Sequence, residues 1–509
     1  MTIKFENLTI FPFLFSIFPV VLLFSENIDE INLYDFAQPL FLTIFSSITL
    51  FLILNFFIRN SVKTGLILSY LASIFFSYGY IFGILQDTFL SDLIHHRFLL
   101  PFFLISTVII IIIILRTKKN LHHARSITNV VSVVMILFVS INIFSFYINN
   151  DITFETSNVI DIEQSKNILN APDIYHIILD EYSNSRVLYD DLNFDNSLFI
   201  NYLKNSNFYV IDNAFTNYDS TETVLYSILN LEYLTESNFE KYQRLNTDFG
   251  IDNNFVMKFL KQHNYEIIVP YSGYGSPNKF LDSDKIICSD VVFLKNRFFN
   301  ELSRTTILNY FVEKQIENER RFIQECTLRN LPLIGDDSNE KPVYVFTHLF
   351  IPHPPYLFDK DGNHVTPQSN KLKGLTGWNN KDGYINEIQF ANNQIIDIVS
   401  KILSKSDNVI IIIQGDTGNT ILNNSSVENY MEKRLSILYA IYLPTDIFVP
   451  DDLTPINTYR LIFTNYFNEE FESLENKYFY NIEEIKFGES EFSKLKDITD
   501  LILEYKKLL

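Results

Sequence analysis

The sequence predicts a membrane anchor of five helical spans followed by an α/β domain whose central sheet is mostly parallel. Three observations carry this prediction: charge is segregated along the chain, five long apolar stretches occupy its first third, and short β-branched runs alternate with helical patterns in the rest. The 509 residues combine a formal net charge of −20 with a mean hydropathy of +0.08. An evenly acidic chain would be hydrophilic, so the apolar and acidic residues must occupy different regions.

The charge excess lies in the C-terminal part. Residues 1–148 contain 8 basic and 7 acidic side chains, which leaves 32 of the 40 basic and 53 of the 60 acidic residues for residues 149–509, a net charge of −21. Such a region repels phosphate backbones and contains no basic patch, so nucleic-acid binding is not expected. The 2 cysteines, Cys288 and Cys326, either pair outside the cytoplasm or remain as free buried thiols.

Five uncharged stretches are apolar enough to cross a bilayer, which takes about 20 helical residues. The first is short and contains Pro12 and Pro19, and a signal peptide is its alternative interpretation; the absence of a small-residue cleavage site favours a retained span. None carries an ionisable group that would mark a transport path, so anchoring is the predicted role. The spans are Leu8–Phe24, Leu40–Ile58, Thr64–Gln86, Phe98–Leu115 and Ile127–Ile148.

The loops predict the orientation, because basic residues beside spans stay in the cytoplasm. The loops at 59–63 and 116–125 carry six basic residues and no acidic one, whereas the loops after the first and third spans are mostly acidic. The N-terminus is therefore predicted to be cytoplasmic, and the domain after the fifth span to lie outside the cytoplasm as part of a multi-pass cell-membrane protein.

The remaining chain has the pattern of an α/β domain. Runs that are apolar at every residue predict strands buried on both faces, as in a parallel sheet covered by helices. Predicted strands are 173–179, 208–211, 265–269, 342–346, 408–413 and 437–442, and predicted helices are 193–203, 253–262, 297–329, 385–404 and 455–467. The predicted domains are the anchor at 1–148, a linker at 149–172, the α/β domain at 173–470 and a tail of undetermined structure at 471–509.

Reactive groups of doubly wound sheets collect at the carboxyl ends of the strands. Asp180 follows the first predicted strand in IYHIILDEY, and Asp416 follows a later one in NVIIIIQGDTGNT, between Gly415 and Gly418. Acidic oxygens at such positions suit a hard or borderline cation. The alternatives are an ordinary helix cap for Asp180 and a plain Gly-Asp turn for Asp416.

Hydroxyl and imidazole groups supply the other candidates. Thr221 begins an apolar helical run and is the preferred candidate of this segment, before Ser220 and Thr223. A hydroxyl at this position is either a nucleophile assisted by the helix dipole or an ordinary N-cap. His348 and His353 follow a predicted strand in THLFIPHPPY and are expected on a loop rim suited to an anion or a metal. Structural histidines are the alternative.

The order of these motifs, an acid after a strand, a Thr at a helix start, a His-rich loop and a strand followed by Gly-Asp-x-Gly, resembles that of the alkaline phosphatase superfamily. With its five-span anchor, the chain is most similar to the membrane-anchored sulfatase-like branch, which includes lipoteichoic acid synthase-like and phosphoethanolamine transferase-like enzymes. The resemblance implies an alkaline phosphatase-like fold for the outer domain and extends through EKRLSILYAIYLP and PINTYRLIFTNYF.

The resemblance implies one divalent metal ion, manganese or zinc, held by Asp180, Thr221 and Asp416. The histidine that follows the aspartate in the family is Thr417 in this chain, which leaves the fourth ligand in question. Val224 also stands where the family often has a serine. His348 and His353 match histidines that contact the transferred group or the metal in relatives, and one of them is expected to replace the missing ligand.

The resemblance further implies a two-step transfer of a phosphoryl-type group on a lipid- or glycan-linked substrate. Thr221 attacks, a covalent threonyl intermediate forms, and water or an acceptor resolves it, while the histidines donate to the transferred oxygens or protonate the leaving group. Sulfate transfer is disfavoured, because neither Cys288 nor Cys326 is followed by Pro at +2 and Arg at +4, as in formylglycine sulfatases. The alternatives are a pseudoenzyme that serves as a membrane-anchored binding module and, less favoured, a transporter accessory protein.

Overall fold

The computed structural model describes residues 8–28, 31, 33–86, 95–149, 171–235, 238, 251–273, 280–335, 341–365, 380–421, 427–481 and 495–508. Its chain forms two compact units. The first contains residues 1–154, 291–319 and 371–374, and the second contains 155–290, 320–370 and 375–509. Nearly all of the linker predicted at 149–172 falls outside the described residues. The predicted domain boundaries remain a prediction.

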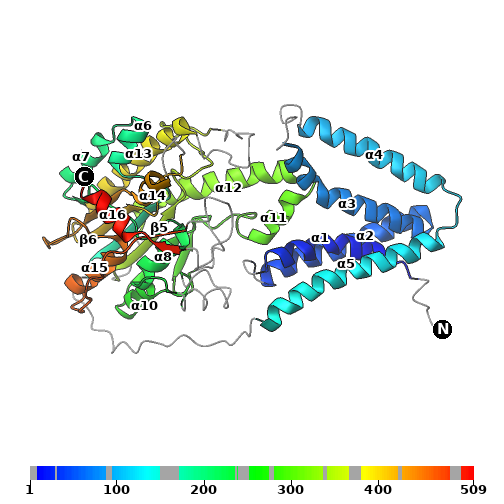
Figure 1. Ribbon diagram of the computed structural model, residues 1–509, viewed down its shortest axis with the longest axis horizontal. Coiled ribbons are helices and arrows are strands. Elements are labelled where there is room, and N and C mark those ends of the chain that lie inside the picture. Colours follow the sequence, from blue (N-terminus) through cyan, green and yellow to red (C-terminus); the bar gives the residue numbers. More distant parts are fainter. Residues whose placement is uncertain are drawn as a thin grey trace. The chain divides into compact units, whose positions relative to one another are not determined.

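The first unit is built on apolar helices, as predicted (Figure 1). Four of them are long and apolar enough to cross a membrane, whereas the helix at the N-terminus has 16 residues and a length of about 24 Å. This shorter helix packs against three of the others, and the side chain of Asn129 accepts hydrogen bonds from the backbone of Ile10 (3.3 Å) and Phe11 (3.1 Å). The helices are α1 (Phe11–Glu26), α2 (Leu33–Ile58), α3 (Ser61–Gln86), α4 (His96–Arg116) and α5 (His122–Asn149).

A segment far along the chain also belongs to the first unit. Helix α11 (Arg297–Thr305) packs Phe298 against Phe24 and Phe36. The carboxyl end of α11 approaches Gly79 of α3 so closely that a Cβ on Gly79 would lie 2.0 Å from the carbonyl oxygen of Arg304. One helix was predicted over 297–329. The structure instead ends α11 before Thr306, whose hydroxyl accepts the N–H of Leu308 and so competes with helix continuation.

The second unit contains the predicted, mostly parallel sheet, of seven strands in the order β2-β7-β6-β1-β5-β3-β4. The strands from β6 to β4 are parallel, while β7 is antiparallel to both of its neighbours. The short strand β4 was not predicted, because its three residues are half-exposed and form no buried run. The strands are β1 (Asp173–Leu179), β2 (Tyr209–Val210), β3 (Glu266–Pro270), β4 (Lys285–Ile287), β5 (Val343–Leu349), β6 (Val409–Gly415) and β7 (Tyr439–Tyr442).

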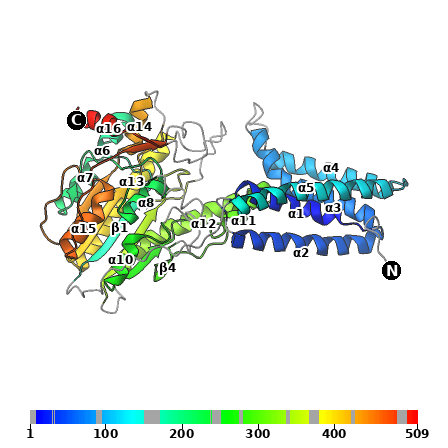
Figure 2. The same cartoon turned by 60° about the horizontal axis from the view of Figure 1, so that its bottom comes forward.

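Helices cover both faces of the sheet (Figure 1, Figure 2). One face packs on α8 (Thr221–Asn230), α10 (Phe255–Gln262) and α15 (Thr458–Tyr466), around side chains such as Ile178, Phe346 and Ile412. The other face packs on α6 (Ser185–Leu192), α7 (Ser197–Asn205) and α13 (Lys381–Lys405). Burial on both faces explains why most positions of the central strands are apolar.

The remaining elements complete the second unit. Helix α12 (Asn309–Asn330) is divided between the units, and its Cys326 forms a disulfide with Cys288, so the paired alternative holds in this structure. Helix α14 (Val427–Leu435) precedes β7. The C-terminal part contains the antiparallel pair β8 (Phe479–Asn481) and β9 (Leu495–Asp497), followed by α16 (Thr499–Lys506), and two short 3-10 helices lie at Leu331–Leu333 and Pro455–Asn457.

Candidate metal centre

Strand register brings Asp180, His348 and Asp416 together. Strand β1 pairs with β6 and β5 on either side, with Leu179 opposite both Gly415 and Leu349, and Ile178 opposite His348. Asp180 and Asp416 therefore follow neighbouring strands at the same level. Because side chains alternate along a strand, all three groups fall on the face that carries Ile178. His348 is a residue of β5 itself, which corrects the prediction that it lies on a loop after the strand.

The three side chains form a buried cluster with the geometry of a metal site. Their nearest ligand atoms all lie within 4.8 Å of one another, with Nε2 of His348 3.5 Å from Oδ2 of Asp180 and 3.8 Å from Oδ2 of Asp416. Burial raises the pKa of Asp180 well above its usual value, and the neighbouring carboxylates add to this effect. Oδ1 of Asp180 is buried without a hydrogen-bond partner among the described residues, an arrangement that a bound cation would satisfy.

Thr221 lies at the first position of α8, and its hydroxyl donates a 2.6 Å hydrogen bond to Oδ2 of Asp416. The other two candidate hydroxyls, those of Ser220 and Thr223, instead form a hydrogen bond with each other at 2.8 Å. Of the three candidates in this segment, Thr221 is the one whose hydroxyl contacts the cluster in the part of the chain that the structure describes.

Thr417 is fully buried, and its contacts orient Asp416. The backbone N–H of Thr417 donates to Oδ1 of Asp416 at 2.6 Å, and its hydroxyl lies 3.4 Å from the same oxygen. The backbone N–H of Glu181 donates to Oδ1 as well, at 3.0 Å. These bonds leave Oδ2 of Asp416 facing Thr221 and His348. The imidazole in the cluster therefore comes from β5, and Thr417 supports the aspartate.

His353 lies on the loop after β5, with its ring 4.3 Å from that of Phe350. Its Nδ1 donates to the carbonyl oxygen of Pro354 at 2.5 Å, so Nε2 carries the lone pair when the ring is neutral. Burial lowers the pKa of His353 to about 3, while the charges of Arg434 and Asp416 also act on it. His353 follows His348 by five residues, on the loop that continues from β5.

The two glycines of Gly-Asp-Thr-Gly serve close backbone packing. A Cβ on Gly415 would lie 2.4 Å from the carbonyl oxygen of Tyr182, and one on Gly418 would lie 2.0 Å from that of Lys433. The N–H of Gly418 donates to the carbonyl of Arg434 at 2.7 Å. Gly415 is therefore required by the backbone of the loop after β1, and Gly418 by the backbone at the end of α14.

Glu181 and Arg434 are residues of the site that sequence reasoning missed. Nη1 of Arg434 pairs with Oε1 of Glu181 at 2.7 Å, and both side chains are nearly buried. Burial raises the pKa of Glu181 to about 7, while Arg434 acts in the opposite direction. The sequence offered a weak signal, because Glu181 directly follows Asp180, but Arg434 stands in the charged run EKR, which is typical of a solvated helix.

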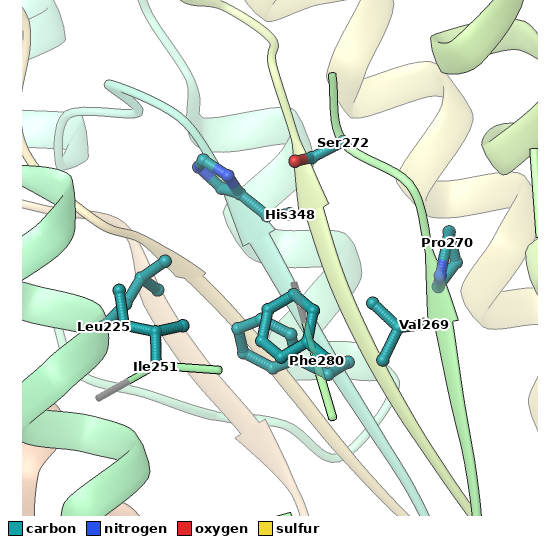
Figure 3. A pocket seen from close by; sticks show the side chains of 8 residues that line it. Leu225, Ile251, Val269, Pro270, Ser272, Phe280 and His348 are labelled. Atoms are coloured by element: carbon teal, nitrogen blue, oxygen red, sulfur yellow. The ribbon is translucent and has the colours of Figure 1, made fainter. Parts of the chain in front are cut away.

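An apolar cavity adjoins His348 (Figure 3). Its walls come from α8 through Leu225, from β3 through Val269, and from the neighbouring Ile251 and Phe280. His348 lies at one end, beside Ser272 (Figure 3). His348 therefore has a largely apolar surface on this side.

No protein-family model and no curated protein sequence matches the chain. Solved structures do match. The C-terminal periplasmic domain of EcEptC from Escherichia coli, in complex with Zn, has a TM-score of 0.40 and 11% identity over 66% of this chain and 94% of that chain. The lipoteichoic acid synthase LtaP from Listeria monocytogenes has a TM-score of 0.36 and 12% identity over 57% and 71%. The putative sulfatase yidJ from Bacteroides fragilis has a TM-score of 0.37 and 11% identity over 63% and 83%.

These structures come from the protein classes that the order of the motifs resembles. All three TM-scores are below 0.5, so the functional argument rests on the geometry of the site.

Proposed function

We propose that this protein is a membrane-anchored, metal-dependent phosphotransferase or phosphodiester hydrolase that uses Thr221 as its nucleophile. The observation that carries the proposal is the convergence of two carboxylates, an imidazole and a hydroxyl: the cluster of Asp180, His348 and Asp416, with Thr221 2.6 Å from Asp416. Its substrate is a lipid- or glycan-linked phosphodiester, as the resemblance implies. A sulfuryl substrate is disfavoured further because both cysteines are in a disulfide.

The residues fit a divalent cation. Two carboxylates, one imidazole and one hydroxyl are a donor set suited to zinc or manganese, and the unsatisfied Oδ1 of Asp180 is available as a ligand atom. Asp180, His348, Asp416 and Thr221 would hold the ion, and Thr417 would support it through Asp416. When bound, the cation would supply electrostatic stabilisation of the charge on the nucleophile and on the transferred group.

The chain's own groups account for the steps. The hydroxyl of Thr221 already points its proton at Oδ2 of Asp416, and the start of α8 places the positive end of a helix dipole beside it. Attack forms a bond between Oγ1 of Thr221 and phosphorus, breaks the bond to the leaving oxygen, and passes the hydroxyl proton of Thr221 to Oδ2 of Asp416. His353 can supply a proton to that oxygen only in its charged form; because burial lowers its pKa to about 3, this role requires the negative charge of the bound substrate to raise that pKa. Water or an acceptor hydroxyl then displaces Thr221.

Orientation is part of the proposal. Five crossings that start in the cytoplasm place the second unit outside it, and this requires α1 to cross as well as the four longer helices. The packing of α1 against α2, α3 and α5 supports a crossing, because a helix surrounded by others need not meet the full thickness of the lipid.

A trapped intermediate tests the proposal. Full-length protein in detergent is loaded with Mn²⁺ or Zn²⁺, mixed with bis(4-nitrophenyl) phosphate, quenched in acid and digested for mass spectrometry. We expect a modified Thr221 in the wild type and in the matched control Thr223→Val, and none in Thr221→Ala. If the metal-loaded wild type shows neither a modified Thr221 nor release of nitrophenol, the role of Thr221 as nucleophile is refuted and the pseudoenzyme is favoured.

A further inference from the structure

Arg434 makes contact with three separate loops of the site. Its Nη1 donates to Oε1 of Glu181 at 2.7 Å and to the carbonyl oxygen of Gly418 at 2.5 Å. Its Nε donates to the carbonyl oxygen of Asp219 at 3.1 Å. These partners belong to the loop after β1, the loop after β6 and the segment before α8, so one guanidinium joins parts of the chain that are far apart in sequence.

Each contact lies next to a residue of the proposed metal centre. Glu181 directly follows Asp180, Gly418 is two residues after Asp416, and Asp219 is two residues before Thr221. The contact with Gly418 is reinforced, because the carbonyl of Arg434 accepts the N–H of Gly418 at 2.7 Å. A shift of Arg434 would therefore move the two aspartates and the threonine relative to one another.

The burial of these groups makes the contacts costly to break. The side chain of Arg434 is 12% exposed and that of Glu181 is 2% exposed. Removing one partner of a buried ion pair leaves an uncompensated charge, so each partner holds the other in place. Lysine cannot reproduce the arrangement, because a single ammonium group lacks the planar fork that reaches three acceptors in fixed directions.

We propose that Arg434 is a positioning residue that sets the spacing of Asp180, Asp416 and Thr221 by tying their three loops together. The proposal rests on the metal centre proposed above. It assigns to Arg434 no contact with the substrate or the metal. Its effect is geometric, and positive charge alone at this position does not provide it.

Metal titration of full-length protein in detergent tests this role, with Zn²⁺ as the probe. The variants are Arg434→Met, Arg434→Lys and the double variant Arg434→Met with Glu181→Gln, which avoids a buried unpaired carboxylate. Lys433→Met is the matched control, because this neighbouring cation pairs its ammonium group with Asp191 of α6 at 2.8 Å. We expect affinity to fall about 10–100-fold in all three Arg434 variants, as for other groups that orient metal ligands, and to remain unchanged in the control.

Hydrogen exchange of the metal-free proteins gives a second readout. We expect faster amide exchange in Arg434→Lys and in the double variant at all three loops, near residues 181, 219 and 418, and no change in Lys433→Met. A folded Arg434→Lys with wild-type affinity and wild-type exchange would overturn the positioning role while leaving the metal site intact. A wild type that binds no metal would instead refute the proposed function, and the exchange pattern would still decide whether Arg434 ties the loops.

Discussion

The hydroxyl of Thr221 and Oδ2 of Asp416 lie 2.6 Å apart although 195 residues separate them in sequence. The contact joins the start of α8 to the end of β6. It places the proposed nucleophile on the same carboxylate that lies 3.8 Å from His348. The other oxygen of Asp416 is held by backbone N–H groups, so the orientation of this carboxylate links the fold to the proposed chemistry.

Thr417→His tests whether the site lacks an imidazole. Thr417 is fully buried, so the larger ring should destabilise the protein by about 1–3 kcal/mol. Because His348 already lies in the cluster, we expect no gain in Zn²⁺ affinity, measured by calorimetry beside thermal unfolding. Binding that becomes tenfold tighter would mean that the natural site is incomplete and would favour the pseudoenzyme.

Gly418→Ala tests the close approach of α14. A Cβ at this position would lie 2.0 Å from the carbonyl oxygen of Lys433, so we expect a loss of about 1–3 kcal/mol in the free energy of unfolding and weaker Zn²⁺ binding. Gly83→Ala is the control, because among the described residues no atom beyond its own stretch of helix backbone lies within 4 Å of the added methyl group. Equal unfolding temperatures for the two variants would contradict the packing described for Gly418.

Glu387 should make stability depend on pH. Burial raises its pKa to about 8, above a usual value of 4.5, although the backbone N–H groups of Leu357 and Phe358 bond to Oε1. The native state keeps the proton that the unfolded chain releases, so this group's contribution to stability is complete below pH 4.5 and is lost as the pH rises through 8.

Glu387→Gln should remove this loss, because the amide retains an acceptor for the two N–H groups and does not ionise. We expect the free energy of unfolding of the wild type, measured with denaturant, to fall relative to that of the variant between pH 6.5 and 8. Curves that remain parallel over that range would show that Glu387 is ionised in the native state.

The disulfide and the orientation can be tested together. Cys288 and Cys326 are bonded, which is typical of oxidising compartments, and the proposed topology places them outside the cytoplasm. We expect purified protein to react with a maleimide only after reduction. In intact, reduced cells, a membrane-impermeant maleimide should label the wild type but not a variant with both cysteines replaced by serine. Labelling that requires permeabilised cells would reverse the orientation.

The sequence predicted the parts of the fold that follow from local pattern. Strands β1, β5 and β6 are mostly apolar runs, and the rule that polar residues after buried strands collect at one edge selected Asp180 and Asp416, whose carboxylate oxygens lie within 4.8 Å of each other. His348 was selected but placed outside its strand, because the predicted run ended at 346 and the polar pair Thr347 and His348 resembled a loop.

Tertiary contacts were beyond such patterns. Arg434 stands in a charged helix, and nothing in its neighbourhood indicates that the fold buries it against Glu181 and two loop carbonyls. The pairing of Cys288 with Cys326 and the packing of α11 on the apolar helices likewise depend on how distant segments meet. Sequence periodicity carries no information on such contacts between distant segments.

Calorimetric titration of the full-length protein with Zn²⁺ or Mn²⁺ tests the central claim most directly. We expect one site per chain in the wild type, at least tenfold weaker binding in Asp416→Asn and His348→Ala, and unchanged binding in His353→Ala, whose imidazole serves the transferred group. A wild type that binds neither ion, or a His348→Ala variant that binds as tightly as the wild type, would contradict it.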